Sequence, residues 1–339
     1  MPSRAWFVDR YGGPERLILR ERSDPEPGPR EVAIRTAAIG LNFADLFVRA
    51  GVYPRTPPPP FVPGMEISGV VEASGAEVSG LPAGSRLVAV PIFGGHAERV
   101  LCPASRVFPV PAGVDLVEAA AMPVIFLTAH HAIREAQVRA GERVVVTAAA
   151  GGVGTALLQF LRQRGARVLA LASSEEKLDL CRSLGAEAGA LYEAAPRALR
   201  EIFGGRADVV FDAIGGRVFR TLWRMLAPGG RYVLYGFAAA SKPGGLGRLR
   251  AARSLAAMGL FSPYSFVSSC RSLIGFNLSL LPDRTGELRE AAASILADWT
   301  AGRLRPVLGE RFAFERLPDG HRALASRKTT GKLLVAVSG

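Results

Sequence analysis

The sequence of 339 residues is 49% hydrophobic and 21% charged, with 42 Lys and Arg against 30 Asp and Glu. This length exceeds what one hydrophobic core usually supports, so we expect two domains, and the apolar content excludes disorder as the main state. The net charge of +12 suits nucleic acid, an anionic membrane surface or a phosphorylated ligand. Because the charges are dispersed along the chain, a solvated basic surface is the simpler explanation.

The N-terminal residues contain only short apolar runs, which Asp9 and Arg10 interrupt. They lack the long apolar stretch of a signal peptide, so we expect a cytoplasmic protein. The three cysteines, Cys102, Cys181 and Cys270, lie far apart. Neither a disulfide framework nor a local metal knuckle can be built from that spacing, so we predict no metal site.

The first 120 residues predict a β-rich, barrel-like region. Strand candidates lie at residues 32–40, 68–75 and 86–94, each bounded by turn residues. The proline run at residues 57–60 provides no backbone donors for a sheet and predicts an extended loop.

From about residue 122 the pattern changes to strands alternating with amphipathic helices, which predicts a doubly wound parallel sheet. A mixed pattern follows residue 266, with a strand near 273–279, a helix near 285–301 and a terminal strand at 332–337. The strand candidates of the alternating region are 143–148, 167–172, 188–192, 207–215 and 230–236, and its helix candidates are 155–164, 175–184, 196–203 and 217–226.

The most informative segment is an apolar strand that runs into the turn AAAGGVG and then into a helix. The three small positions of the dinucleotide-binding fingerprint fall on Ala149, Gly151 and Gly154, with Ala in place of the first Gly. Gly151 lets the backbone approach a pyrophosphate, Gly154 lets the helix pack against the strand, and free N–H groups meet the negative charge. We therefore predict that the turn binds a dinucleotide, the alternative being a purely structural turn. Its remaining predicted contacts are Ala150, Gly152 and Val153.

The tip of the second strand bears on the choice of nucleotide. An enzyme that uses NAD commonly has Asp or Glu there, whereas this chain has Ser173 and Ser174, followed by Lys177. Two hydroxyls and a cation suit a 2′-phosphate, so we expect NADPH. The alternative is that Lys177 is a solvated helix residue.

Five segments together resemble the medium-chain dehydrogenase/reductase superfamily, and within it the zinc-free NADPH:quinone oxidoreductase branch. They are GLNFADLFVRAGVY, PGMEISGVV, EAAAMPVIFLTAHHAI, AAAGGVG and TTGKLLV, in the order and spacing of that family. The tail and GFNLSLL are similar to the vesicle amine transport protein-like subgroup.

The resemblance implies a Rossmann-type domain inserted into a GroES-like, β-rich catalytic domain. The GroES-like domain would comprise residues 1–124 and 267–339, and the Rossmann domain residues 125–266. The resemblance also implies a homodimer that forms through the nucleotide-binding domain.

Zinc-dependent members of this superfamily have Cys where this chain has Asn42, and the motif GHE where it has Gly64, Met65 and Glu66. The lobe with four clustered cysteines is also missing. We therefore expect an enzyme without zinc, in which the histidines have core or pocket roles. These are His96, His130, His131 and His321.

The resemblance assigns roles to individual residues. Asn42 and Tyr53 match polar groups of the quinone site, where Tyr53 is the better candidate proton donor. The cofactor contacts that it implies are Thr128 and, at the nicotinamide, Gly236, Phe276 and Leu278; Lys177, Tyr192 and Arg327 at the 2′-phosphate; and Lys332. Plain structural roles remain alternatives for Tyr53, Arg327 and Phe276.

We therefore expect hydride transfer from NADPH to a quinone or an α,β-unsaturated carbonyl. One alternative is an enoyl-thioester reductase, which would share the architecture. Another is a nucleotide-loaded protein with little catalysis that contacts a membrane or RNA through the basic segment 241–258, which contains Arg248, Arg250 and Arg253.

Overall fold

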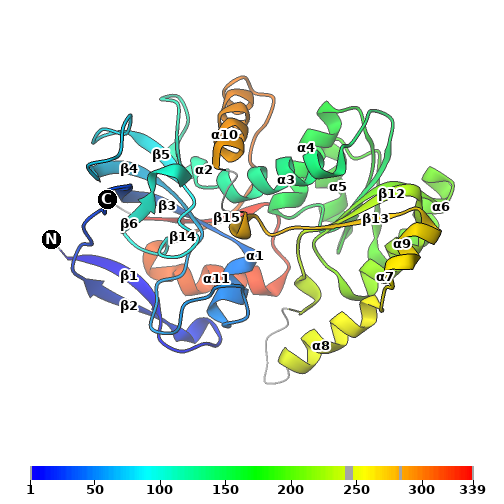
Figure 1. Ribbon diagram of the computed structural model, residues 1–339, viewed down its shortest axis with the longest axis horizontal. Helices are drawn as coiled ribbons and strands as arrows, with labels where there is room; N and C mark the ends of the chain where they lie inside the picture. Colours follow the sequence, from blue (N-terminus) through cyan, green and yellow to red (C-terminus); the bar gives the residue numbers. More distant parts are fainter. Residues whose placement is uncertain (1, 241–246, 282–284, 338–339) are drawn as a thin grey trace. The chain divides into compact units, whose positions relative to one another are not determined.

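The computed structural model describes residues 2–240, 247–281 and 285–337, and divides the chain into two compact units (Figure 1). Unit 1 comprises Met1–Leu127 and Pro282–Gly339, and unit 2 is Thr128–Leu281. Along the chain, unit 2 thus lies between the two segments of unit 1. The second boundary differs from the expected one, because residues 267–281 belong to unit 2 and not to the GroES-like part.

Unit 2 is built on a six-stranded parallel sheet in the order β10-β9-β8-β11-β12-β13. With β8 as the first strand this is the order 3-2-1-4-5-6, which confirms the doubly wound prediction. The sixth strand, β13, pairs with β12 and explains why residues 267–281 join this unit. The strands are β8 (Arg143–Val146), β9 (Arg167–Ala172), β10 (Ala188–Leu191), β11 (Ala207–Asp212), β12 (Leu226–Leu234) and β13 (Ser272–Gly275).

Helices cover both faces of this sheet. Figure 1 shows α4 (Gly152–Gln163) and α5 (Glu175–Ser183) above it and α7 (Gly216–Arg224) below it. On the α7 side, α6 (Ala195–Phe203) and α7 pack their apolar residues on alternate residues of the strands, such as Val145, Leu169 and Val210. Apolar side chains on both faces explain the continuous hydrophobic runs of these strands.

Three more helices complete the description of unit 2. They are α3 (Pro123–Ala136), which begins in unit 1, α8 (Gly247–Met258) and α9 (Pro263–Ser269). Of the basic segment 241–258, residues 241–246 lie outside the described residues, and the rest forms α8 with Arg253 exposed. Among the described residues, no helix combines the length and the hydropathy needed to cross a bilayer.

Unit 1 is β-rich, as expected. A seven-stranded sheet has the order β14-β15-β3-β4-β5-β7, with β6 paired to β3, and a separate ribbon joins β1 to β2. The strand expected at residues 86–94 ends at Ala89, because Pro91 has no N–H and Ile92 has φ of 72°. The strands are β1 (Ser3–Val8), β2 (Leu17–Arg22), β3 (Glu31–Leu41), β4 (Glu66–Ser74), β5 (Arg86–Ala89), β6 (Arg99–Pro103), β7 (Val107–Pro109), β14 (Leu308–Ala313) and β15 (Lys332–Ala336).

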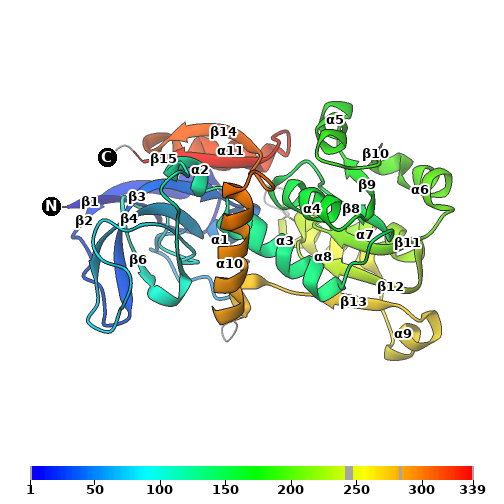
Figure 2. The same ribbon diagram turned by 90° about the horizontal axis from the view of Figure 1, so that it is seen from above.

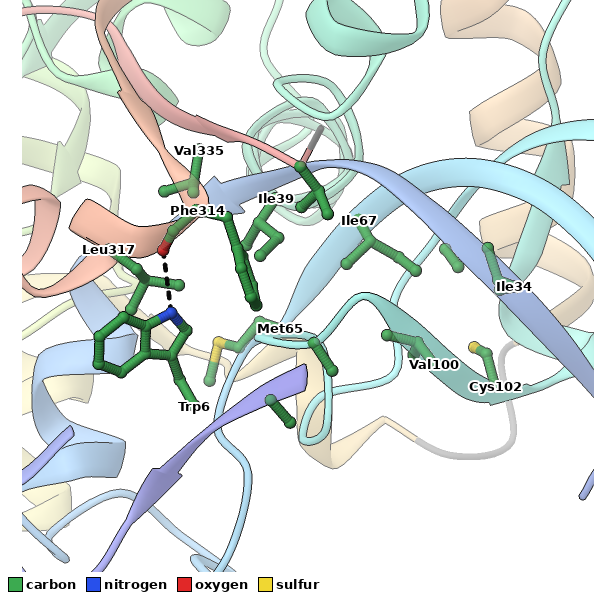
Figure 3. Packing of buried hydrophobic residues seen from close by; sticks show 14 of the residues in the cluster. Trp6, Ile34, Ile39, Met65, Ile67, Val100, Cys102, Phe314, Leu317 and Val335 are labelled. Carbon is green, nitrogen blue, oxygen red and sulfur yellow. Dashed lines mark hydrogen bonds between the residues drawn. The ribbon is translucent and has the colours of Figure 1, made fainter. Parts of the chain in front are cut away.

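The core of unit 1 joins residues from both ends of the chain. Figure 3 shows Trp6 beside Phe314 and Leu317, with the indole N–H of Trp6 donating to the Phe314 carbonyl at 2.9 Å. Burial of these side chains ties the C-terminal part to the N-terminal part. In this C-terminal part, β14 and β15 lie side by side (Figure 2). The helices of the unit are α1 (Phe43–Arg49), α2 (Leu116–Ala119), α10 (Thr285–Thr300) and α11 (Leu317–Ser326).

Candidate active site and nucleotide site

Three neighbouring strands of unit 1 place Asn42, Glu66 and Lys332 together. In β3, Leu41 pairs with Leu333 of β15, and Gly40 pairs with Glu66 of β4. A Cβ atom at Gly40 would lie 2.6 Å from Glu66 Oε1 and would also overlap the Ala120 carbonyl oxygen. Glycine at this position therefore makes room for the carboxylate beside the strand.

These three side chains form a buried, charge-balanced network. Asn42 Nδ2 donates to Glu66 Oε1 at 2.8 Å, and Lys332 Nζ donates to Asn42 Oδ1 at 2.6 Å. Lys332 also forms an ion pair with Glu66, whose Oε2 accepts the Val124 N–H at 2.7 Å. Glu66 is 0% and Lys332 2% exposed, so the pair is shielded from water. The network fixes the orientation of the Asn42 amide.

A second buried polar group lies along α1, just after Asn42. Asp45 accepts the Asn42 N–H at 2.7 Å, and its burial raises the pKa of Asp45 to about 7. One turn later, Arg49 donates to the Gly12 carbonyl and to His321 Nδ1, and burial lowers the pKa of Arg49 to about 10. The rings of His321 and His96 meet edge to face at 5.3 Å. Both histidines are fully buried, which agrees with the expected core role.

Tyr53 and Arg327 also belong to unit 1. Tyr53 is half-buried in the loop after α1, where its carbonyl accepts the N–H and hydroxyl of Thr56. Arg327 ends α11, and its guanidinium lies 5.9 Å from the centre of the Phe43 ring, at the start of α1. The structure thus places Lys332 in contact with Asn42, and places Arg327 beside Phe43, the residue that follows Asn42.

The glycine-rich turn of unit 2 follows β8. Gly151 donates to the Ala148 carbonyl at 2.9 Å and precedes α4, whose first N–H groups have no acceptor within the helix. A Cβ atom at Gly154 would overlap the Ala148 carbonyl oxygen, so only glycine allows this approach. Of the other predicted contacts in this segment, Ala150 lies in the turn, and Gly152 and Val153 lie in the first turn of α4.

The residues predicted to bind the 2′-phosphate lie at and just after the tip of β9. Ser174 caps α5 by accepting the Lys177 N–H, and Lys177 Nζ donates to Ser173 Oγ at 3.3 Å. Partial burial lowers the pKa of Lys177. The hydroxyl of Tyr192, just after β10, accepts the N–H of Ala148 at 2.9 Å. Tyr192 therefore contacts the glycine-rich turn.

Two residues that the sequence analysis did not identify lie at the end of β11 and just after β12. Asp212, at the end of β11, accepts hydrogen bonds from Thr147 Oγ1, Tyr232 OH and the amides of residues 214 and 215. The buried hydroxyl of Tyr235, just after β12, has no hydrogen-bond partner among the described residues. The signal for Asp212 was its position directly after an apolar strand and before glycines, whereas nothing local marks the Tyr235 hydroxyl.

The predicted nicotinamide contacts surround this region of unit 2. A Cβ atom at Gly236 would lie 2.8 Å from the Ala213 carbonyl oxygen, so glycine is required there too. Phe276 packs between His131, 4.6 Å away edge to face, and Tyr235, 6.4 Å away and stacked. Thr128 is buried on α3, and Leu278 begins a short 3₁₀ helix, Leu278–Leu280.

Unit 2 thus offers what a dinucleotide phosphate needs. Free helix N–H groups, glycines that permit close approach and the unpartnered hydroxyl described above lie at or near the carboxyl ends of the strands. In the part of the chain that the structure describes, no group of three or more His, Cys, Asp or Glu side chains is arranged to hold a metal ion.

Comparisons with known proteins agree with this geometry. Residues 28–112 match the alcohol dehydrogenase GroES-like domain, and residues 152–280 match the zinc-binding dehydrogenase family. The chain is 33% identical to quinone oxidoreductase-like protein 2 of Bos taurus, over 95% of this chain and 90% of that protein. It is 31% identical to the synaptic vesicle membrane protein VAT-1 homolog of Rattus norvegicus, over 98% and 84%.

A solved structure shows the same architecture. The quinone oxidoreductase of Thermus thermophilus, described together with its NADPH complex, is 38% identical, with a TM-score of 0.82 over 98% of this chain and 99% of that one. The chain therefore belongs to the medium-chain dehydrogenase/reductase superfamily of oxidoreductases, in the branch of the quinone oxidoreductase-like proteins and VAT-1 homologues.

Proposed function

We propose that this protein is an NADPH-dependent reductase that transfers hydride to a quinone or an α,β-unsaturated carbonyl. The observation that carries the proposal is the turn between β8 and α4, which follows the first strand at the point where the strand order reverses. Open α/β sheets bind nucleotides at this point. The Thermus relative, which was solved with NADPH, supports the same cofactor.

The side chains after β9 support NADPH over NADH. Ser173 and Lys177 are already within 3.3 Å of each other, and no carboxylate occupies the strand tip to bind a ribose 2′-hydroxyl. A cation beside hydroxyls stabilises the additional negative charge of a 2′-phosphate. Glu175 and Glu176 lie in the first turn of α5, one and two residues after Ser174.

In this proposal the bound nucleotide supplies the hydride, and Asn42 and Tyr53 act on the acceptor. The amide of Asn42 is held by Lys332 and Glu66, and within the described chain the second N–H of its Nδ2 has only a 3.4 Å contact with the Gly40 carbonyl. That N–H is the donor for the acceptor's oxygen as negative charge develops on it. Tyr53, with a phenol hydroxyl, then donates the proton.

The test is a fluorescence titration with NADPH and with NADH, followed by oxidation of the bound nucleotide with 1,4-benzoquinone, 9,10-phenanthrenequinone, an enone and an enoyl-CoA. We expect tighter binding of NADPH and turnover with the quinones or the enone. Turnover with the enoyl-CoA alone would replace this proposal by the enoyl-thioester reductase. Binding without any turnover would favour the nucleotide-loaded protein that contacts a membrane or RNA.

We also propose that two copies associate through unit 2. Among the described strands, β13 lies at an edge of its sheet, with β12 as its neighbour (Figure 2). Its residue Leu273 is exposed. A strand edge of this kind with an exposed apolar side chain favours pairing with the same strand of a second copy. Light scattering should give twice the chain mass of 35.9 kDa, and the mass of a single chain would refute the association.

A further inference from the structure

The residue that begins the glycine-rich turn has a backbone conformation that needs support. Ala148 has φ of 49°, in the left-handed region that non-glycine residues rarely occupy. Its carbonyl accepts the Gly151 N–H and is the atom that a Cβ at Gly154 would meet. The positions of Gly151 and of the first turn of α4 therefore depend on how Ala148 is held.

The backbone N–H groups around Ala148 have different kinds of partner. Thr147 donates to the Phe211 carbonyl of β11 at 2.9 Å, and Ala149 donates to the Leu171 carbonyl of β9 at 3.1 Å. The Ala148 N–H between them donates to the hydroxyl of Tyr192 at 2.9 Å. A side chain thus holds the left-handed residue, while the sheet holds its two neighbours.

The position of Tyr192 suits this task. It follows β10, which is two strands away from β8 in the sheet, and its ring packs against the apolar cluster between the sheet and α6 and α7. A half-buried ring that packs against this cluster has little freedom, so its hydroxyl is a well-positioned acceptor.

We propose that Tyr192 is a positioning residue for the phosphate-binding turn, acting through the Ala148 N–H. The inference rests on the proposed nucleotide function and deepens it. It differs from the role that the family resemblance implies for Tyr192, which is direct contact with the 2′-phosphate. The turn serves the pyrophosphate, which NADPH and NADH share, whereas Ser173 and Lys177 lie where the two nucleotides differ.

This division of roles makes opposite predictions for two variants. Tyr192→Phe keeps the ring and removes the acceptor, so the Kd values for NADPH and NADH should rise by the same factor, about five- to tenfold for one lost hydrogen bond. Lys177→Met should raise the Kd for NADPH and leave that for NADH unchanged. Tyr11→Phe, which removes an exposed phenol hydroxyl in unit 1, is the control and should change neither.

A rescue variant separates positioning from direct contact. Glycine adopts a φ of 49° without strain, so Ala148→Gly added to Tyr192→Phe should restore most of the lost affinity for both nucleotides. A Tyr192→Phe variant that loses affinity for NADPH alone would overturn the proposal. So would unchanged affinity for both nucleotides.

Hydrogen exchange at the Ala148 amide, measured without nucleotide, keeps this inference separate from the proposed function. Tyr192→Phe should speed that exchange about five- to tenfold and leave the amides of β10 unchanged. If the unmodified protein bound neither nucleotide, the proposed function would be wrong, while the exchange experiment would still decide the role of Tyr192. Unchanged exchange at Ala148 would overturn that role.

Discussion

Replacing Lys332 with Met is the most direct test of the buried network at Asn42. The change removes the cation and leaves Glu66, which is 0% exposed, with two hydrogen bonds from the described residues, donated by Asn42 Nδ2 and Val124 N. Removing one partner of a buried ion pair typically costs about 3–5 kcal/mol of unfolding free energy. Since a domain is typically stabilised by about 5–15 kcal/mol, unit 1 should become markedly less stable.

The double variant Lys332→Met, Glu66→Gln should recover part of this loss. It removes both charges of the buried pair, and Gln retains an oxygen for the Asn42 amide. We therefore expect the two changes to be non-additive, with a coupling free energy of about 2 kcal/mol or more. As a surface control, Arg30→Met breaks the exposed ion pair with Glu77 and should cost at most about 1 kcal/mol.

Urea denaturation followed by tryptophan fluorescence can be made specific for unit 1. Trp6 and Trp299 are buried in unit 1, whereas Trp223 lies in unit 2. All variants would therefore be compared in a Trp223→Phe background. A cost below about 1 kcal/mol for Lys332→Met, or strict additivity of the two changes, would show that the pair does not hold the site in the way proposed.

Three further predictions concern pH, the turn and turnover. Burial lowers the pKa of His96 from 6.5 to about 3. Between these two pH values the unfolded chain binds a proton that the folded chain does not, so the unfolding free energy decreases as the pH is lowered from 6.5 to about 3. His321 acts in the same direction, and Asp45, with its raised pKa, acts in the opposite one. His96→Leu should therefore reduce the slope of unfolding free energy against pH by about 1.4 kcal/mol per pH unit between pH 4 and 6. An unchanged slope would contradict this prediction. Gly154→Ala should weaken NADPH binding at least about tenfold in a titration, because the Cβ of the new alanine would overlap a backbone oxygen. The control variant Gly113→Ala, where a Cβ has open space, should bind NADPH normally. Tyr53→Phe should lower kcat with quinones and enones while the Kd for NADPH stays constant, and a variant with full kcat would remove Tyr53 as the proton donor.

Elements whose signal is local could be predicted from the sequence. Continuous apolar runs predicted the strands β8 to β12, and the spacing of Gly151 and Gly154 predicted the turn, because strand burial and close helix packing depend on neighbouring residues. The β-rich character of unit 1 followed in the same way from short runs separated by Gly and Pro.

Contacts between residues that are distant in the sequence could be identified only in the folded chain. Asn42, Glu66 and Lys332 become neighbours because β3 lies between β4 and β15, and Tyr192 reaches Ala148 from two strands away. The same holds for β13, whose four residues joined the nucleotide sheet instead of the C-terminal part. Local periodicity records which face of an element is buried but not which strand lies beside it, so strand order and the contacts that follow from it appear only in the folded chain.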